Sequence, residues 1–199
     1  MPEGAARRRK LFAGIELDGH VREASAEVSA ALRATGFDAR YEATEKLHVT
    51  LAFLGFVEPS RGEEVAAALT GAAARVVPFA VSLDKLGAFP HERRPRVVYI
   101  GSRAQGEAFR RLAGEIRNRY AELGFAFESD AVAHVTIARV KAPQKTLPLV
   151  EFAPIVLEIR ELALFESLPD PARNTSRYKI VARAPFYRLP TTDSVAMSS

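Results

Sequence analysis

Two copies of one short motif, 86 residues apart, constrain this 199-residue chain more than any other feature. The first copy is His48-Val49-Thr50-Leu51-Ala52 and the second is His134-Val135-Thr136-Ile137-Ala138. The chain has only four histidines, and at ordinary residue frequencies two such matches are expected in well under roughly 1% of chains. The motif is therefore an internal repeat, and it predicts two equivalent strands.

The spacing within each copy determines which side chains point together. Residues i and i+2 of a strand project from the same face. His48 therefore lies beside Thr50 and His134 beside Thr136, whereas the aliphatic residues face the other way. If the two halves of the chain are related by an approximate twofold axis, the two His-Thr pairs meet across a cleft.

The order of apolar patterns along the chain predicts an α+β fold with mixed or antiparallel sheets. Helical spacing of apolar residues marks three helices, and runs rich in β-branched and aromatic residues mark the strands. The expected helices cover 21–32, 59–73 and 109–123, the last ended by Gly124, and the expected strands cover 11–17, 47–56, 79–89, 96–101, 125–140, 155–168 and 178–186.

No linker divides the chain into separately folded parts. We expect one domain over 10–187, with 1–9 and 190–199 as tails, because both ends are polar or small and lack periodicity. The Pro-rich stretch 141–154 is the best candidate for a crossover between two lobes.

Composition excludes several classes of protein. Hydrophobic residues make up 48% of the chain and charged residues 26%, an ordinary globular balance. Cysteine is absent, which excludes disulfides, a thiolate nucleophile and cysteine-ligated metals, and suits a reducing cytoplasm. No apolar run approaches the roughly 20 residues of a membrane span. The formal net charge of +4 is compatible with a polyanionic partner.

Two imidazoles that face one substrate can divide the work of proton transfer. Because the unperturbed pKa of histidine is about 6.5, one imidazole can accept a proton while the other donates one. The two threonine hydroxyls can hold phosphate oxygens, so the set suits in-line cleavage of a phosphodiester. We expect no metal and no cofactor, because two histidines alone make a poor metal site.

The repeat and three further stretches of the sequence resemble those of a known family. The repeat, the opening run 11–17, the stretch 50–55 and the late strand 164–167 are similar to the two-histidine (2H) phosphoesterases, and most of all to the prokaryotic RNA 2′,3′-cyclic phosphodiesterases, also called 2′-5′ RNA ligases. The resemblance covers roughly 10–187. It implies a bilobal α+β fold in which antiparallel or mixed sheets line a central cleft with helices outside. It also implies hydrolysis of an RNA 2′,3′-cyclic phosphate to a 2′-phosphomonoester, with reversible 2′-5′ joining.

The resemblance also implies roles for individual residues. His48 is the expected general acid and His134 the expected general base, although the sequence alone does not decide which is which. Thr50 and Thr136 are expected to hold phosphate oxygens. The residues five places after each histidine are implicated as well: Arg139 as a phosphate anchor and Phe53 as a cleft contact. Strand alternation places both on the opposite face, so a bulge or strand end would have to re-aim them.

Other residues carry weaker expectations. His20 and His91 lack the threonine partner and are expected at the surface. The loop with Arg93, Arg94 and Arg96 could hold an RNA backbone or simply be solvated. Tyr99 is more often a core residue than a base-stacking one, and Phe56, Phe79 and Phe89 are expected in the core.

Two alternatives to the RNA enzyme stay open. One is a 2H enzyme that acts on a small cyclic nucleotide, and the other is a non-catalytic RNA-binding module. In each case we expect a cytoplasmic monomer that does not bind a membrane.

Overall fold

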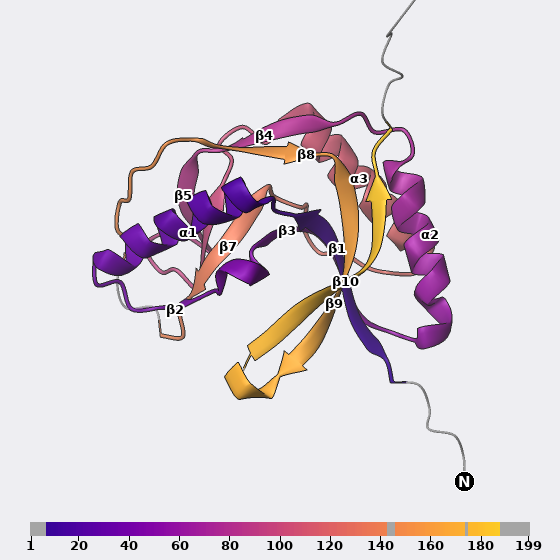
Figure 1. The fold of residues 1–199 in the computed structure, drawn as a ribbon, viewed down its shortest axis with the longest axis horizontal. Helices are drawn as coiled ribbons and strands as arrows, with labels where there is room; N and C mark the ends of the chain where they lie inside the picture. Colours follow the sequence, from indigo (N-terminus) through magenta and orange to yellow (C-terminus); the bar gives the residue numbers. More distant parts are fainter. Residues whose placement is uncertain (1–6, 143–145, 174, 188–199) are drawn as a thin grey trace, which may run out of the picture.

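An antiparallel sheet forms the body of the molecule and carries both copies of the repeat (Figure 1). The structure is a computed structural model that describes residues 7–142, 146–173 and 175–187. Within these residues the eight strands of the large sheet are β1 (Arg9–Glu16), β2 (Arg40–Tyr41), β3 (His48–Val57), β5 (Lys85–Phe89), β6 (Val97–Gly101), β7 (His134–Arg139), β9 (Glu161–Asp170) and β10 (Thr175–Pro185). A separate pair is formed by β4 (Phe79–Leu83) and β8 (Ile155–Ile159). The described helices are α1 (Gly19–Ala34), α2 (Gly62–Ala73) and α3 (Glu107–Glu122), with short 3-10 turns at Thr44–Lys46 (η1), Pro59–Arg61 (η2) and Pro171–Arg173 (η3). The expected α+β class is confirmed.

The order of strands in the large sheet has an approximate twofold symmetry. The order is β10-β9-β1-β3-β7-β6-β5, and β2 pairs with β7 beside this path. The central strands β3 and β7 are antiparallel, with Val49 opposite Val135. An axis between these two residues exchanges β3 with β7, β1 with β6 and β9 with β5. The connections agree, since α1 lies between β1 and β3 in the chain and α3 between β6 and β7.

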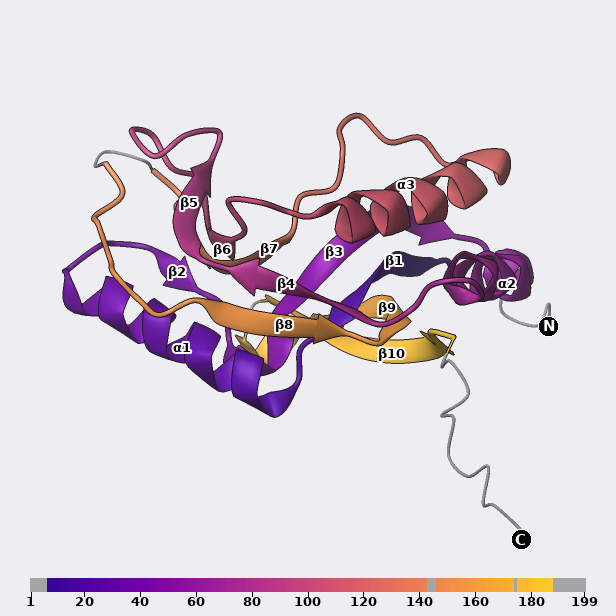
Figure 2. The same ribbon diagram turned by 90° about the horizontal axis from the view of Figure 1, so that it is seen from above.

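Helices α1 and α3 tie the two halves together, because each covers a central strand of the opposite half. Helix α1 packs on β7 and β8, whereas α3 packs on β3 and α2, and α2 packs on β9 and β10. In Figure 2, α1 lies beside β8, and α2 and α3 lie together at the other end of the molecule. The aliphatic residues of the repeat face these helices: Val49, Leu51, Val135 and Ile137 are each at most 2% exposed. Burial of each such side chain stabilises the fold by about 1.5–3 kcal/mol and holds the central strands in place.

Helix boundaries follow from ordinary capping chemistry. The Asp18 carboxylate accepts a 2.8 Å hydrogen bond from the backbone N–H of Val21 and so caps α1. Helix α3 ends before Gly124, as predicted; this glycine has a φ of +87°, which a residue with a Cβ rarely adopts.

Several sequence-based boundaries differ from the structure. Strand β1 begins at Arg9, inside the stretch expected as a tail, because Arg9 lies opposite Val57 and its guanidinium binds Glu166 at 2.9 Å. The expected strands 79–89 and 155–168 each divide in two, near Asp84 and Arg160, and only His134–Arg139 of 125–140 is a strand. Arg7 and Arg8 are exposed and form no helix or strand, and the rest of the expected tails, 1–6 and 190–199, lies outside the described residues.

The stretch 141–154 connects β7 of the large sheet to β8 of the small one. Its residues 143–145 lie outside the described part, and the others form no helix or strand. In the part of the chain that the structure describes, no helix has both the length and the apolar character that crossing a membrane requires.

Candidate active site

The two histidines begin the two central strands, and the strand pairing brings them together. His48 is the first residue of β3 and His134 the first residue of β7. Because Val49 lies opposite Val135 in an antiparallel pair, His48 comes opposite Thr136 and Thr50 opposite His134. All four side chains line one pocket of about 240 Å³. The cleft expected from the repeat is therefore present, with both His-Thr pairs in it.

Each histidine ring is oriented by a carbonyl two residues earlier in the chain. The distance from Nδ1 to the carbonyl oxygen is 2.7 Å for His48 and Lys46, and 2.8 Å for His134 and Val132. A carbonyl oxygen only accepts hydrogen bonds, so Nδ1 carries the proton in both rings. This leaves Nε2 free to exchange a proton in the pocket, and Nε2 of His48 lies 3.0 Å from Thr50 Oγ1.

Aromatic side chains pack around both imidazoles. The ring of His48 lies 4.8 Å from that of Phe12, 5.0 Å from Tyr178 and 5.7 Å from Phe165, measured between ring centroids. The ring of His134 lies 5.3 Å from both Phe89 and Tyr99. The rings are thus held on their faces and edges, and both histidines line the pocket.

This burial alters the acid–base behaviour of both histidines. It lowers the pKa of His48, and the nearby His134 and Arg139 add to the effect, whereas the hydrogen bond to the Lys46 carbonyl and the charge of Glu42 oppose it. Burial also lowers the pKa of His134, with a further contribution from Arg139 and opposition from the hydrogen bond to Val132. In the free protein both rings are therefore mainly neutral at pH 7.

Two matching β-bulges bring Phe53 and Arg139 into the same pocket. In β3, Thr50 lies opposite Gly14 and Ala52 opposite Ala13, so Leu51 is an extra residue. In β7, Thr136 lies opposite Tyr99 and Ala138 opposite Val98, so Ile137 is extra at the same place in the repeat. Each bulge shifts the alternation by one position. Phe53 and Arg139 consequently share the face of the histidines and line the pocket, and the objection from ideal strand geometry is removed.

The pocket also contains charged residues that the sequence did not reveal. Glu42 accepts hydrogen bonds from Arg139 Nε at 2.8 Å and from Lys46 Nζ at 3.2 Å. Both Glu42 and Lys46 are largely buried, with side chains 11% and 10% exposed. They follow the short strand β2 and lie in or beside the turn η1, where no periodic pattern marks them. The remaining lining residues outside the two motifs are Lys10, Phe12, Ser167, Ser176 and Tyr178.

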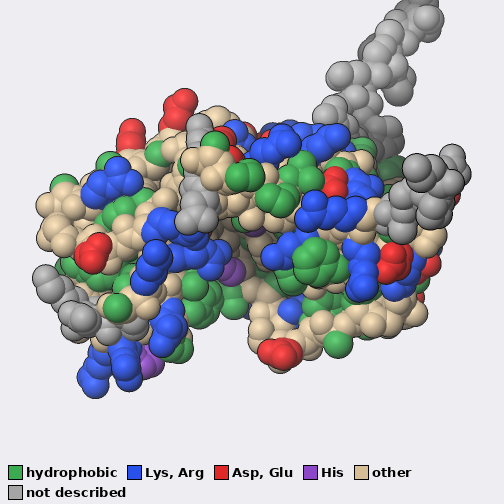
Figure 3. All heavy atoms as spheres, turned by 90° about the horizontal axis from the view of Figure 1, so that it is seen from below, with side chains coloured by type: hydrophobic (Ala, Val, Ile, Leu, Met, Phe, Trp, Pro, Cys, Tyr) green, Lys and Arg blue, Asp and Glu red, His purple; other side chains and the backbone are tan. Residues whose placement is uncertain are grey.

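The charge of the pocket suits a phosphodiester. Its lining includes three cations, Lys10, Lys46 and Arg139, against the single carboxylate of Glu42. With neutral histidines, the pocket therefore has a net charge of +2, which attracts an anion. On the face seen in Figure 3, lysine and arginine side chains gather on both sides of a central hollow.

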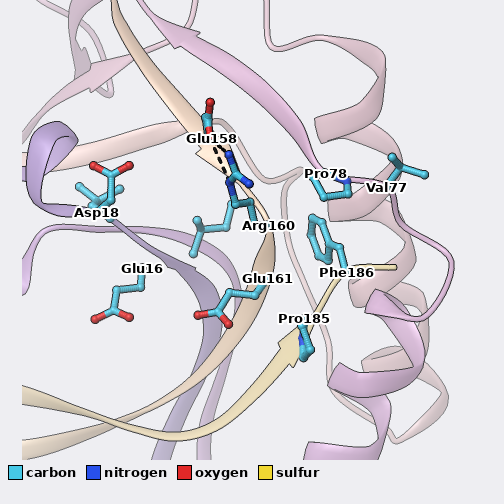
Figure 4. A pocket seen from close by; sticks show the side chains of 11 residues that line it. Glu16, Asp18, Val77, Pro78, Glu158, Arg160, Glu161, Pro185 and Phe186 are labelled. Carbon is cyan, nitrogen blue, oxygen red and sulfur yellow. Dashed lines mark hydrogen bonds and ion pairs between the residues drawn. The ribbon is translucent and has the colours of Figure 1, made fainter. Parts of the chain in front are cut away.

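A larger cavity, of about 790 Å³, shares no lining residue with the histidine pocket. Figure 4 shows its carboxylates, from Glu16, Asp18, Glu158 and Glu161, around one guanidinium, that of Arg160. Arg160 is bound to Glu158 (Figure 4). Arg183, outside this lining, binds both Glu16 and Glu161. The lining contains no histidine, so this cavity lacks the paired acid–base groups of the histidine pocket.

The structure also places the other histidines, Tyr99 and the arginine loop, for which the sequence-based predictions were weaker. His20 and His91 are exposed, as expected, and Tyr99 is a core residue, 6% exposed, that packs against His134. The loop residues Arg93, Arg94 and Arg96 are all exposed, which fits either interpretation of that loop.

Two of the phenylalanines expected in the core, Phe79 and Phe89, are partly buried. Phe56 was placed in the core wrongly. It is 65% exposed, because a second irregularity in β3, at Leu54 and Gly55, turns it toward the side of Lys10.

No group of three or more His, Asp or Glu side chains that could hold a metal ion occurs among the residues that the structure describes. The side-chain ligand atoms in the pocket are two imidazoles, five hydroxyls and one carboxylate that is already bound to two cations. What the pocket offers is paired acid–base groups next to anion-binding groups. Fold and site together define a twofold α+β protein with two His-x-Thr strands at a common cleft.

Comparison with known proteins assigns this arrangement to a family. The 2′-5′ RNA ligase superfamily model matches residues 21–171, so the chain belongs to that superfamily and the resemblance to the 2H phosphoesterases is confirmed. An RNA 2′,3′-cyclic phosphodiesterase from Thermotoga maritima is 29% identical over 181 residues, covering 89% of this chain and 95% of that protein. One from Archaeoglobus fulgidus is 33% identical over 174 residues, covering 81% of this chain and 93% of that protein.

Solved structures show the same fold. The crystal structure of TT0787 from Thermus thermophilus has a TM-score of 0.77 and 28% identity, and the match covers 89% of this chain and 97% of that one. Escherichia coli LigT complexed with 3′-AMP has a TM-score of 0.72 and 26% identity, covering 91% of this chain and 99% of LigT.

Proposed function

We propose that this protein hydrolyses the 2′,3′-cyclic phosphate at an RNA end to a 2′-phosphomonoester, with reversible 2′-5′ joining as a second activity. The observation that carries the proposal is the meeting of the two His-Thr pairs in one pocket. Membership of the superfamily supports it, as do the relatives that are named RNA 2′,3′-cyclic phosphodiesterase.

The proposed reaction needs two proton transfers around one phosphorus atom. Neutral His134 accepts a proton from water through Nε2 while the water oxygen attacks phosphorus. The bond from phosphorus to the 3′ oxygen breaks, and protonated His48 donates its Nε2 proton to that oxygen. The products are a 3′-hydroxyl and a 2′-phosphomonoester, and the two histidines then regain their starting states by exchange with solvent.

The other pocket groups bind the phosphate. The hydroxyls of Thr50 and Thr136 donate hydrogen bonds to its non-bridging oxygens, and the Arg139 guanidinium balances the charge that develops on them. Phe53, which is 52% exposed, offers a flat apolar surface for the attached nucleoside. Binding of the anion favours the protonated form of His48, which the empty pocket disfavours.

The setting of the reaction is also part of the proposal. We infer that the protein works as a monomer in the cytoplasm, as one domain over 10–187, and that the acid–base pair needs no metal ion or cofactor. RNA is favoured over a mononucleotide because the pocket has a net charge of +2 and because lysine and arginine side chains gather on both sides of the hollow seen in Figure 3.

The test is turnover of an RNA oligonucleotide that ends in a 2′,3′-cyclic phosphate, in EDTA, followed by ³¹P NMR. We expect the cyclic phosphate signal to be replaced by that of a 2′-phosphomonoester. A nucleoside 2′,3′-cyclic monophosphate, measured in parallel, should have the lower kcat/KM.

Each alternative has its own outcome in this experiment. Faster turnover of the mononucleotide would favour the enzyme of small cyclic nucleotides. Salt-dependent RNA binding without turnover would favour the non-catalytic module. Activity that disappears in EDTA and returns with a divalent cation would overturn the metal-independent mechanism.

A further inference from the structure

One buried carboxylate, that of Glu42, connects the two halves of the pocket. Its Oε1 accepts a 2.8 Å hydrogen bond from Nε of Arg139, which belongs to β7. Its Oε2 accepts a 3.2 Å hydrogen bond from Nζ of Lys46, which precedes His48 and β3. The Arg40 guanidinium lies 3.9 Å from Oε1. One side chain, 11% exposed, thus contacts cations from both sides of the twofold axis.

The backbone of Glu42 also holds the bulge that directs Arg139 into the pocket. Its N–H donates a 2.8 Å hydrogen bond to the carbonyl of Ile137, the extra residue of the β7 bulge. The strand β2 just before it is in register with β7, with Arg40 opposite Arg139 and Tyr41 opposite Ala138. Glu42 therefore stabilises both the bulge and the side chain that the bulge re-aims.

The second contact of Glu42 leads to the catalytic ring of His48. Lys46 is held by Glu42 and by Thr175 of β10, whose Oγ1 accepts a hydrogen bond from Nζ at 2.9 Å. The backbone carbonyl of the same Lys46 accepts the Nδ1 hydrogen bond of His48. A lysine fixed at both its side chain and its backbone keeps this carbonyl in place, and the carbonyl sets the tautomer and the plane of the ring.

We propose that Glu42 is a positioning residue that holds Arg139 over the phosphate and fixes the Lys46 carbonyl that orients His48. The inference rests on the proposed function and adds to it a residue that lies outside both His-x-Thr motifs. It also breaks the symmetry of the site, because the Glu42 carboxylate acts on the His48 side through Lys46 and on the His134 strand through Arg139.

Charges around the carboxylate are consistent with this role. Burial alone raises the pKa of Glu42, but Lys46 and Arg139 more than offset it and hold the pKa below its ordinary value, so the group is ionised. The ionisable groups around His48 are Glu42, Lys46, His134, Arg139 and Tyr178 in the pocket, and Glu16, Arg22 and Glu45, which line another cavity together with His48. The charge of the Glu42 carboxylate favours the protonated form of His48, whereas the charges of His134 and Arg139 oppose it.

The test is Glu42→Gln, with Glu64→Gln as the matched control. Glutamine keeps the shape but loses the charge, and its amide can accept from only one of the two cations. Glu64 is also ion-paired, to Arg61 at 2.6 Å, but lies in α2 and does not line the pocket. We expect kcat/KM on the cyclic-phosphate oligonucleotide to fall about 10- to 100-fold in E42Q and to stay within about twofold of wild type in E64Q.

Two readouts separate positioning from a merely structural effect. In an Arg139→Ala background, E42Q should lower kcat/KM by less than about threefold, because the guanidinium that Glu42 positions is already absent. The alkaline limb of the kcat/KM profile should move to lower pH in E42Q, because His48 then loses its proton at lower pH, and should not move in E64Q.

Several results would overturn the inference. One is a kcat/KM in E42Q equal to that of wild type. Another is a fall in kcat/KM that is the same with and without Arg139, together with an unchanged pH profile. If E42Q does not fold, E42Q/K46M is compared with K46M, and equal kcat/KM in these two would overturn it as well. Absence of turnover in both wild type and E64Q would instead defeat the proposed function, and this inference with it.

Discussion

The two histidines of the repeat have equivalent backbone positions but different neighbours. Both donate from Nδ1 to a carbonyl two residues earlier. His48 packs among three aromatic rings, those of Phe12, Phe165 and Tyr178, and it is the ring on which Glu42 acts. His134 packs against two, Phe89 and Tyr99. In the proposed mechanism, the division of acid and base roles between the two histidines therefore depends on residues outside the repeat.

The lowered pKa values of both histidines predict the pH dependence of activity. In the proposed mechanism the base His134 must be neutral and the acid His48 protonated, so kcat/KM falls on the acid side as His134 gains a proton and on the alkaline side as His48 loses one. Because burial lowers both pKa values, we expect the maximum of kcat/KM below about pH 6.5, the unperturbed value. The two limbs belong to the coupled pair.

The same argument predicts a different profile for kcat. The bound phosphodiester anion favours protonated imidazole, so the kcat maximum should lie at higher pH than that of kcat/KM. Steady-state kinetics of wild type from about pH 4.5 to about pH 9, in buffers of constant ionic strength, measure both. A kcat/KM profile centred well above pH 7 would contradict the account of the free site.

The sequence was sufficient for the His-Thr pairs because their arrangement is local. An i, i+2 spacing in a strand places His48 with Thr50, and His134 with Thr136, whatever the rest of the chain does. Glu42 and Lys46 could not be found in this way. They lie in an irregular segment, and their role depends on β2 pairing with a strand about a hundred residues later. A buried carboxylate between two cations is a tertiary feature and leaves no periodic signal.

At the scale of single elements, the bulges in β3 and β7 decide which residues reach the pocket. Ideal alternation places Phe53 and Arg139 on the wrong face and Phe56 in the core. The extra residues Leu51 and Ile137 correct the first two, and the irregularity at Gly55, whose φ is +70°, exposes Phe56. Helices α1 and α3 were predicted because apolar residues recur at helical spacing over 21–32 and over 109–123, which is a strong signal. A bulge, in contrast, adds only one residue to a strand, and its position is determined by the pairing with the neighbouring strand.

Close contact between β1 and β3 beside the first bulge depends on Gly14. A Cβ at this position would lie 2.4 Å from the backbone oxygen of Val49, the residue between His48 and Thr50. We therefore expect Gly14→Ala to displace β3, to destabilise the fold by about 1–3 kcal/mol and to lower kcat/KM about 10- to 100-fold.

Gly114→Ala is the control, because a Cβ there has no atom within 4 Å and α3 favours alanine. Urea unfolding and turnover of the cyclic-phosphate oligonucleotide measure the two effects. If G14A keeps the stability and activity of wild type, the prediction is wrong, because β1 and β3 can then separate without moving His48 and Thr50.

At the scale of the whole molecule, neither half can build the site alone. Each contributes one strand, one histidine, one threonine and one bulge, and the halves meet where Val49 lies opposite Val135. Helix α1 of the first half covers β7 of the second, and α3 of the second covers β3 of the first. The same burial that stabilises the central strands therefore fixes the distance between the two imidazoles.

The most direct test of this account replaces each histidine by alanine and measures hydrolysis of the cyclic-phosphate oligonucleotide. His48→Ala and His134→Ala should each lower kcat/KM by at least about 10²–10³-fold, and the double variant should lose little more, because the pair acts as a unit. His91→Ala, at an exposed histidine, is the control, and all variants should keep the far-UV circular dichroism of wild type. Wild-type turnover in either single variant would contradict the claim that two imidazoles, one from each half, act on one phosphorus atom.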